Sequence, residues 1–388
     1  MTKSYLKKVD VIFGEYTNTK YKILDQTLPL SSDEIIEEII NSGLKGRGGA
    51  GFPTGLKWKY AKEQPVEEKF VVCNADEGEP GTFKDREILT RVPRKVLAGM
   101  AICSKAIGAK KGFIYLRGEY NFLEKSIQNE IDIFHEHLKR LNFDFSIEIK
   151  LGSGAYICGE ESALFESMEG KRGEPRNKPP YPTVFGYNGK PTVINNVETF
   201  ATVQVICKIG AKEFKKLGTQ DSRGSKLFSI SGDSPNAGIF ELELGMLLND
   251  FVNEYGDTDT KAVQVGGASG FCVPRKKFND TIIGFEGIPT GGSMMLFNST
   301  RSMYNVLHDY LEFFTEESCG QCTPCRVGCQ QLLKGIEAVK KGERPPSYLE
   351  ELKKLSNTMK IAAKCGLGQS VANPFNSIID NFREEIIY

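Results

Sequence analysis

A short run of cysteines constrains this chain more than any other feature. Cys319, Cys322 and Cys325 lie three residues apart, and Cys365 follows forty residues later in the run Lys-Cys-Gly-Leu-Gly. Thiolates in a C-x2-C-x2-C run, completed by one more cysteine, are typical ligands of a tetranuclear iron–sulfur cluster. A structural zinc site also takes four cysteines, but it usually pairs two separated C-x2-C knuckles, so we favour iron–sulfur. The sequence therefore predicts an electron-transfer cluster.

The spacing alone leaves the fourth ligand open. Cys329 extends the run to the C-x2-C-x2-C-x3-C pattern of bacterial ferredoxins, although Gln330 stands where those proteins have proline. Cys329 and Cys365 are therefore rivals. We expect the other five cysteines to be small buried apolar residues, because they are scattered among apolar neighbours: Cys73, Cys103, Cys158, Cys207 and Cys272.

Composition excludes several classes of protein. The 388 residues suffice for two or three domains, and 50 basic residues balance 50 acidic ones, so no global charge favours nucleic acid or an anionic membrane. The first residues lack the apolar core of a signal peptide, and no apolar run approaches the length of a membrane span. Clustered cysteines without a disulfide pattern fit a reducing compartment, so we expect a cytoplasmic protein.

The first half of the chain has an α/β pattern. Ser31 and Glu34 form a capping box before a helical face of isoleucines, at 35, 36, 39 and 40, which ends near Gly43. Strands are predicted at residues 69–73, 111–116 and 146–151, and long helical patterns such as 121–140 separate them. Alternation of this kind predicts a mostly parallel sheet.

The second half changes character. Residues 210–224 are predicted to be a polar linker. A small α+β region follows, with short strands near 226–231, 262–265 and 293–297 and one helix near 246–254. From residue 301 the pattern is helical, with helices near 326–341 and 347–360 and the cysteine run at a junction between helices.

A glycine-rich loop carries the second chemical signal. Gly46, Gly48 and Gly51 match a G-x-G-x-x-G string, but the loop follows a predicted helix, whereas a Rossmann fingerprint follows a strand. Its glycines still allow backbone N–H groups to approach a phosphate or a flat ring, and Arg47 and Lys57 add positive charge. We therefore expect an anionic ligand here rather than a merely wide turn.

Three acidic and amide clusters follow, at residues 74–79, 159–161 and 195–198. Asn74 comes at the end of a predicted strand, where open sheets bind ligands. Amides can hydrogen-bond to ring atoms, while carboxylates accept from ribose hydroxyls and repel a 2′-phosphate, which favours NAD over NADP. Each cluster alone could equally be a metal site or a solvated surface.

Together these motifs resemble one family, the FMN-binding, NADH-oxidising flavoprotein subunit of respiratory complex I and its soluble relatives in NAD-linked hydrogenases and formate dehydrogenases. The resemblance covers roughly residues 30–385, and its motifs occur in family order at 46–58, 74–81, 154–161, 178–182, 195–199 and 318–326. It implies an FMN- and NADH-binding α/β domain (1–215), a small α+β, β-grasp-like middle domain (216–300) and a C-terminal helical bundle with one [4Fe–4S] cluster (301–388).

The resemblance also implies roles for individual residues. FMN would be held by Gly46, Arg47, Gly48, Lys57, Asn74, Asp76, Glu77, Gly159, Asn195 and Asn196. NAD(H) would lie against Phe52, Tyr60, Tyr181, Lys178 and Glu161, with the three rings stacking on adenine. The expected catalytic set is Glu79, Tyr156 and Glu160, and the expected iron ligands are Cys319, Cys322, Cys325 and Cys365, which resolves the ambiguity against Cys329.

The function that this resemblance implies is conversion of two-electron to one-electron transfer. NADH gives a hydride to FMN, and FMN passes single electrons to the cluster and on to partner subunits, expected to be a thioredoxin-like [2Fe–2S] subunit and a hydrogenase or similar subunit. We expect a minimal core without a thioredoxin-like front or a ferredoxin-like tail. The hydrogenase-like run at 365–370 motivates one alternative, electron bifurcation; the other is a flavin-free scaffold subunit. Surface or core roles rather than catalysis are expected for His135, His137 and His308, which lie in helical patterns.

Overall fold

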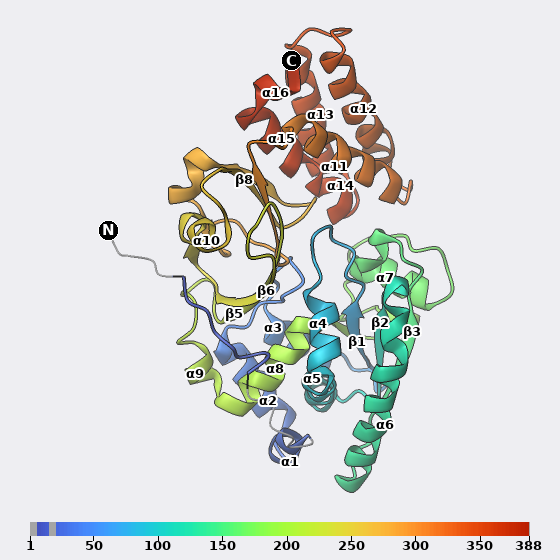
Figure 1. The fold of residues 1–388 in the computed structure, drawn as a ribbon. Coiled ribbons are helices and arrows are strands. Elements are labelled where there is room, and N and C mark those ends of the chain that lie inside the picture. Colours follow the sequence, from blue (N-terminus) through green and yellow to red (C-terminus); the bar gives the residue numbers. More distant parts are fainter. Residues whose placement is uncertain (1–5, 15–20, 388) are drawn as a thin grey trace.

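The computed structural model describes residues 6–14 and 21–387. A four-stranded parallel sheet with the order β3-β2-β1-β4 forms the centre of the first half of the chain (Figure 1). Its strands are β1 (Phe70–Ala75), β2 (Lys111–Leu116), β3 (Ser146–Leu151) and β4 (Thr192–Asn196). The predicted bounds of β2 and β3 agree with the structure, whereas β4 was not predicted as a strand.

Helices surround this sheet, and their ends follow local sequence signals. They are α1 (Lys22–Thr27), α2 (Ser32–Ser42), α3 (Thr54–Lys62), α4 (Lys84–Arg91), α5 (Pro93–Ile107), α6 (Glu124–Arg140), α7 (Glu161–Met168) and α8 (Val197–Ile209). The predicted capping box of Ser31 and Glu34 begins α2, and Gly43 ends it with φ +69°. Ile40 of the predicted apolar face is 39% exposed, so the buried stripe is narrower than expected.

Contacts between α5 and α8 require a residue without a side chain. A Cβ at Gly99 of α5 would lie 2.1 Å from the backbone oxygen of Phe200 in α8. Glycine therefore allows the two helices to approach closely beside the sheet, and this fixes the position of the α8 N-terminus, where Asn196 lies.

A second, five-stranded sheet follows, with the order β6-β5-β11-β8-β9. Its strands are β5 (Ser225–Gly232), β6 (Gly238–Glu243), β8 (Thr260–Val265), β9 (Phe271–Pro274) and β11 (Ser293–Asn298), and α10 (Leu248–Tyr255) packs beside them. The short strands β7 (Met246–Leu247) and β10 (Ile282–Ile283) pair with each other. The predicted linker 210–224 contains the short helix α9 (Ala211–Phe214), whose Phe214 is fully buried, so the linker prediction was wrong there.

The last part of the chain is helical and lies at the far end of the molecule from α1 (Figure 1). Its helices are α11 (Met303–Glu317), α12 (Thr323–Lys340), α13 (Tyr348–Ala362), α14 (Gly366–Ser370), α15 (Ala372–Asn381) and α16 (Arg383–Ile387). One apolar cluster runs from these helices to Ile157 and to Val72 of β1. The helical part and the parallel sheet therefore share a core, which fixes the cysteine run relative to the sheet.

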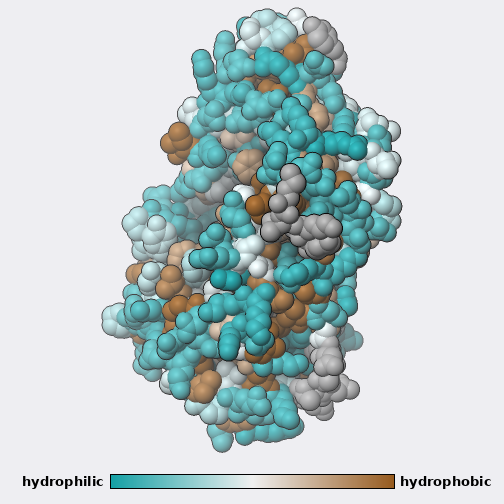
Figure 2. Space-filling view, turned by 90° about the vertical axis from the view of Figure 1, so that its left-hand side faces the viewer, coloured by the Kyte–Doolittle hydropathy of each residue, from teal (hydrophilic) through white to brown (hydrophobic). Residues whose placement is uncertain are grey.

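The face of the molecule in Figure 2 is mostly hydrophilic, with scattered apolar side chains. Among residues 6–14 and 21–387, no helix combines the length and the apolar character that crossing a bilayer requires.

Candidate functional site

Two adjoining cavities lie where β1 and β4 end. The larger, of about 720 Å³, is lined by the glycine loop and by predicted residues from each acidic and amide cluster. The second, of about 490 Å³, shares Gly48, Asn74, Gly159 and Asn196 with the first and adds Asp76, Glu77, Glu79 and Tyr156. The structure thus gathers nearly all of the predicted ligand-binding residues at the carboxyl edge of the parallel sheet, where such sheets bind ligands.

The glycine loop joins α2 to α3 and needs its glycines for close approach. A Cβ at Gly48 would lie 3.2 Å from Cβ of Asn196, and a Cβ at Gly51, which has φ +69°, would lie 2.1 Å from the Phe285 ring. The loop is closed by a hydrogen bond from the Gly46 N–H to the Phe52 carbonyl (2.9 Å). Larger residues would push the loop off the end of β4 and change the shape of the cavity.

Lys57 brings a cation to the wall of the larger cavity. Its Nζ donates to the Ile194 carbonyl (3.0 Å). Burial lowers the pKa of Lys57, and the nearby Glu161 carboxylate opposes that shift. A half-buried ammonium with one neutral acceptor has donors left for an anionic ligand.

Three aromatic rings at the same cavity are exposed. Phe52, Tyr60 and Tyr181 have exposed fractions of 46%, 45% and 58% and line the larger cavity. Large exposed rings around one hollow mark a binding surface, and flat ligands stack on such rings.

The amide side chains are fixed by the protein itself. Asn195 accepts from Trp58 Nε1 (3.0 Å), and Asn74 donates to the Gly159 carbonyl (2.9 Å). Asn196 caps α8 by accepting from the Glu198 N–H (3.0 Å), and it also accepts from Lys84 Nζ (3.1 Å). These contacts hold the amides rigidly at the cavity wall.

Asp76 differs from its neighbours because its carboxylate is buried and both oxygens lack a hydrogen-bond partner within the described protein. Burial raises the pKa of Asp76 to about 7, and Arg117 opposes that shift. An unpaired buried carboxylate is costly unless a ligand donates to it. A ligand with hydroxyl groups, such as the ribityl chain of FMN, fits this requirement.

Two other predicted carboxylates are occupied by helix capping. Glu77 accepts from the backbone N–H groups of Asp85 (2.8 Å) and Arg86 (3.2 Å) at the start of α4. Glu160 accepts from Ser162 and Ala163 at the start of α7. Both still line the smaller cavity, but each has a capping role that the sequence pattern did not predict.

Lys178 closes the edge of the larger cavity with two ion pairs. Its Nζ lies 2.8 Å from Glu160 and 2.6 Å from Glu161. Partial burial would lower the pKa of Lys178, but coulombic attraction to Glu161 and Glu160 raises it. Glu161 has no capping role in the described hydrogen bonds, so its carboxylate is more readily released to a ligand than that of Glu160.

Arg47 is the predicted residue whose side chain the structure places outside the lining of both cavities. Its side chain is 1% exposed and donates to the Arg223 carbonyl (2.6 Å), next to β5 and away from the two cavities. Burial lowers its pKa to about 10, although Glu198 and Glu241 oppose the shift. These two carboxylates stabilise the guanidinium inside the protein, so it is structural rather than part of the cavity wall.

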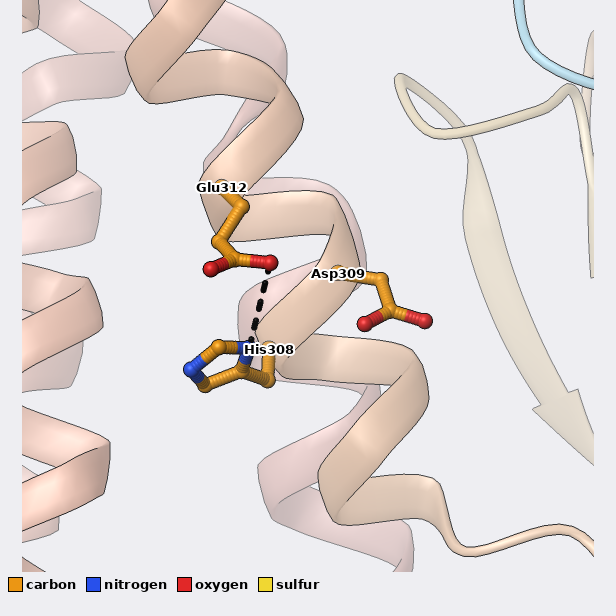
Figure 3. Close-up of side chains that lie close together, drawn as sticks. All are labelled: His308, Asp309 and Glu312. Carbon is orange, nitrogen blue, oxygen red and sulfur yellow. Dashed lines mark ion pairs between the residues drawn. The ribbon is translucent and has the colours of Figure 1, made fainter.

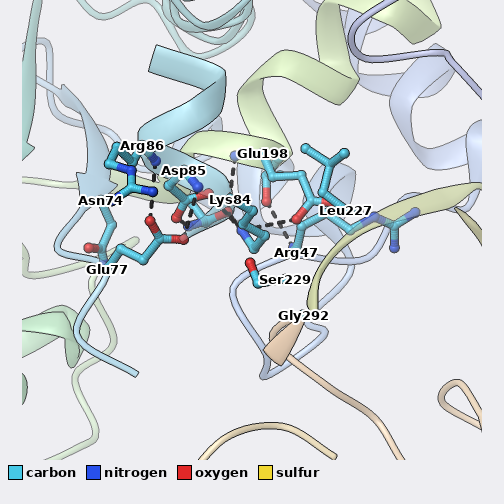
Figure 4. A network of polar contacts seen from close by, with 12 residues as sticks. Arg47, Asn74, Glu77, Lys84, Asp85, Arg86, Glu198, Leu227, Ser229 and Gly292 are labelled. Carbon is cyan, nitrogen blue, oxygen red and sulfur yellow. Dashed lines mark hydrogen bonds and ion pairs between the residues drawn. The ribbon is translucent and has the colours of Figure 1, made fainter. Parts of the chain in front are cut away.

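Figure 4 shows the buried polar network to which Arg47 belongs. Glu198 lies 3.0 Å from both Lys84 and Lys226, and Lys84 also pairs with Asp85 (2.6 Å). The network connects α4 and α8 beside the parallel sheet to β5 of the second sheet. Sequence reasoning missed Lys84 at the cavity wall, and no local signal identifies it, because only tertiary contacts bring it beside Asn196.

The cysteines form a separate small site. Cys319, Cys322, Cys325 and Cys365 line one cavity together with Ile157 and Leu367. Hydrogen bonds from Cys329 and Ser318 lower the pKa of Cys325 to about 7, although burial opposes this shift. Four sulfur donors around one hollow fit a [4Fe–4S] cluster. Cys329 is fully buried on α12 with its Sγ 4.0 Å from that of Cys325, and it is not among the residues that line the cavity.

A second group of potential metal ligands lies on α11 (Figure 3). His308, Asp309 and Glu312 offer ligand atoms within 4.8 Å of one another. His308 already pairs with Glu312 (3.5 Å) and with Glu337 of α12 (3.1 Å), and the group is largely exposed. These contacts account for the group as surface ion pairs. All three histidines lie on helices, as expected from the sequence.

Two family models match the chain. The Nuo51 FMN-binding domain matches residues 39–205, and the NADH-ubiquinone oxidoreductase-F iron-sulfur binding region matches residues 305–388. The first match contains every residue that lines the larger cavity, and the second contains the four cysteines of the cysteine cavity.

Curated relatives and solved structures match along nearly the whole chain. The NAD-reducing hydrogenase HoxS subunit alpha of Cupriavidus necator is 43% identical over 99% of this chain and 65% of its own length. An F-type component of the NADH-quinone oxidoreductase of Rhizobium meliloti is 38% identical over 98% of this chain and 96% of its own. The NADP-reducing hydrogenase subunit HndC of Solidesulfovibrio fructosivorans is 41% identical over 94% and 78%. A crystal structure of an NAD+-reducing [NiFe]-hydrogenase in the H2-reduced state superposes with TM-score 0.91 at 42% identity, over 95% of this chain and 64% of that one. The chain thus spans slightly less than two thirds of the hydrogenase subunit of C. necator.

Proposed function

Because this chain belongs to the family of FMN-binding, iron–sulfur proteins of complex I and NAD-reducing hydrogenases, we propose that it oxidises NADH, or reduces NAD+, and exchanges the electrons with partner subunits. FMN, when bound, supplies two-electron exchange with the nicotinamide and one-electron exchange with a [4Fe–4S] cluster. The chain's own residues bind, orient and shield these groups.

One observation carries the proposal, namely that the paired cavities and the cysteine cavity share a wall. Ile157 and Leu367 line both the smaller of the paired cavities and the cysteine cavity. Tyr156, next to Ile157, donates its backbone N–H to Glu317, which lies two residues before Cys319, the first residue of the cysteine run. A flavin and a cluster in these two places would be neighbours, as electron transfer between them requires.

We assign roles by place in the paired cavities. Lys57 would offer its ammonium to the FMN phosphate, the backbone of Gly46, Gly48 and Gly159 would pack against the cofactor, and Asp76 would accept from the ribityl hydroxyls. Asn74, Asn195 and Asn196 would face the isoalloxazine. Glu77 would act mainly as the cap of α4. The Arg47 side chain would not contact FMN, because it is directed to the Arg223 carbonyl.

NAD(H) would occupy the outer part of the larger cavity. Its adenine would stack among Phe52, Tyr60 and Tyr181, and Lys178 and Glu161 would lie beside its ribose. Glu79 and Tyr156 would face the nicotinamide end in the smaller cavity, and Glu160 would fix the start of α7 between the two. Cys319, Cys322, Cys325 and Cys365 would ligate the cluster.

The domain division at 1–215, 216–300 and 301–388, with a β-grasp-like middle domain, is also part of the proposal. So is a partner set of a thioredoxin-like [2Fe–2S] subunit and a hydrogenase or similar subunit in the cytoplasm. The likeness to the HoxS alpha and HndC hydrogenase subunits supports a hydrogenase as the parent complex. Electron bifurcation remains the second candidate function, since it would use the same flavin and cluster with further exits on partner chains.

Anaerobic purification with flavin and iron analysis, followed by NADH oxidation with an artificial acceptor, tests the proposal. We expect one FMN and about four iron atoms per chain. Lys57→Met should lower FMN content and activity together. Lys59→Met, an exposed lysine on the same helix, is the matched control and should change neither. Stoichiometric zinc without iron or flavin would contradict the proposal.

A further inference from the structure

A loop of the second sheet reaches into the smaller cavity and holds Glu79. Ser269 lies between β8 and β9 and donates twice to this carboxylate, from its backbone N–H to Oε1 (3.0 Å) and from its Oγ to Oε2 (2.7 Å). Tyr156, which lies before α7, also donates to Oε2 (2.6 Å). The two oxygens of Glu79 are therefore fixed from two separate parts of the chain.

The loop is built to approach this closely. Gly267 has φ +70°, and a Cβ there would lie 2.4 Å from Glu79 Oε1. A Cβ at Gly270 would lie 1.8 Å from the Val265 carbonyl oxygen, so the turn also requires glycine at its end. Only residues without side chains at these two places let the loop wrap around the carboxylate.

The loop is also anchored on both sides. Gln264 of β8 donates to the Gly267 carbonyl (2.7 Å). Asn373 of α15, in the helical part of the chain, donates to the Ser269 carbonyl (3.0 Å). Ser269 thus connects the second sheet and the cysteine-bearing helices to one carboxylate at the proposed hydride-transfer site.

We propose that Ser269 is a positioning residue that holds the Glu79 carboxylate in place for the nicotinamide end of NAD(H). The inference rests on the proposed function. It gives the second sheet, which has no cofactor of its own in that proposal, an indirect part in the reaction through Glu79. Ser269 acts through Glu79 and is not itself expected to touch the reacting atoms.

The surroundings of Glu79 make this anchoring chemically relevant. Burial raises the pKa of Glu79, and the hydrogen bonds from Tyr156 and Ser269 oppose that shift. The titratable groups that face Glu79 are Tyr156 and, from α11, Tyr310, and burial raises the pKa of both. With two neutral phenols as neighbours, donated hydrogen bonds are what favour the ionised form of Glu79.

A double-mutant cycle on the flavin- and iron-loaded protein tests the inference. Ser269→Ala should lower kcat/KM for NADH about tenfold, because a hydrogen bond to a charged group is lost. The same substitution in a Glu79→Gln background should have little further effect, because its target is already altered. Ser269→Thr, which keeps the hydroxyl, should recover most of the loss.

The pH profile adds a readout that a merely structural role would not move. Removing a donor to the carboxylate should raise the pKa of Glu79, so the acid limb of kcat/KM should shift to higher pH in Ser269→Ala. Ser234→Ala is the matched control, since the hydroxyl of this serine donates to the Tyr255 carbonyl and accepts from the Asn236 N–H, and its pH profile should be unchanged.

Additive effects of Ser269→Ala and Glu79→Gln, with an unshifted pH profile, would overturn the inference while leaving the proposed function intact. A wild-type protein that binds FMN but does not react with NADH would overturn both. FMN and iron contents measured for each variant separate these results from a loss of cofactor.

Discussion

Asp76 presents two buried carboxylate oxygens without a hydrogen-bond partner in the described protein, and burial raises its pKa from 3.8 to about 7. A raised carboxyl pKa means that the folded, flavin-free protein binds this proton more tightly than the unfolded chain does. The contribution of Asp76 therefore favours folding at low pH and is lost as pH rises from about 4 to about 7.

We expect bound FMN to favour the ionised form of Asp76 instead of the protonated form. Hydroxyl donors from the cofactor favour the ionised carboxylate, so the FMN dissociation constant should fall as pH rises through about 7. Asp76→Asn should weaken binding and remove most of this pH dependence, while the exposed Asp33→Asn should leave it unchanged. Flavin fluorescence titrations from pH 5.5 to pH 8.5 measure the FMN dissociation constant at each pH. If its pH dependence were unaltered in Asp76→Asn, Asp76 would be excluded as the group that titrates.

The cluster ligands allow a paired comparison. Cys365→Ser should lose or convert the cluster, because Cys365 lines the same cavity as Cys319, Cys322 and Cys325. Cys329→Ser should leave it nearly intact, because Cys329 lies one helical turn beyond Cys325, is buried and does not line the cavity. Iron content and low-temperature electron paramagnetic resonance of the two variants decide between them. Loss of the cluster in Cys329→Ser but not in Cys365→Ser would mean that Cys329 is the fourth ligand, as in the ferredoxin-type pattern.

Nucleotide preference should depend on Glu161 more than on Glu160 or Glu79. Glu160 is committed to capping α7, Glu79 is held by Ser269 and Tyr156, and Glu161 is bound to Lys178 alone among the described contacts. We expect a strong preference for NADH over NADPH. Glu161→Gln should relax this preference by one to two orders of magnitude, and each order of magnitude corresponds to about 1.4 kcal/mol.

The measurement is the ratio of kcat/KM for NADH and NADPH in wild type and in the Glu161→Gln, Glu160→Gln and Glu79→Gln variants. Glu160→Gln should instead cost about 1 kcal/mol of stability through the weakened cap. The relative HndC, named as NADP-reducing, makes this comparison informative. Equal use of both nucleotides by wild type would refute the NADH preference, and an unchanged ratio in every variant would refute the carboxylate explanation.

At the scale of helices and strands, local sequence signals predicted the elements whose own residues define them. They missed an element that forms through pairing with a strand distant in the sequence. The capping box of α2 and the strands β2 and β3 follow directly from residue pattern. The strand β4 was missed because it is five residues long and ends in two asparagines, which seldom occur in strands. Its central place beside β1 comes from pairing across more than a hundred residues of sequence.

The same division holds for the candidate site. The rule that ligands bind at the carboxyl ends of parallel strands placed Asn74 at a ligand site, and the family resemblance placed Asn196 there; the structure brings both to one pair of cavities. The inward turn of Arg47 and the capping role of Glu160 could not be predicted in this way. Both depend on which tertiary partner is near, Arg223 in one case and the start of α7 in the other.

For the whole molecule, the buried ion network of Glu198 joins the parallel-sheet half to the second sheet. Glu198 accepts from Lys84 and Lys226, and its other oxygen accepts from the Leu227 N–H (2.8 Å). Burial alone would raise the pKa of Glu198, but attraction to Lys226 and Lys84 keeps it below its ordinary value, and burial lowers the pKa of Lys226 to about 8. The carboxylate thus offsets two buried ammonium groups, one from each half.

Glu198→Gln should therefore cost about 3 kcal/mol of unfolding free energy, the usual result of removing one partner from a buried ion pair. It should also weaken FMN retention. Glu198 pairs with Lys84, and Lys84 in turn donates to Asn196 at the cavity wall, so loss of the carboxylate should disturb the position of Asn196. Glu213→Gln, which breaks the exposed pair between Glu213 of α9 and Lys216, is the control and should cost well under about 1 kcal/mol. Denaturant unfolding and the flavin content after gel filtration measure the two effects. If Glu198→Gln lowered stability without loss of flavin, the network would join the two halves but would not position Asn196; if it matched Glu213→Gln in both measurements, neither role would hold.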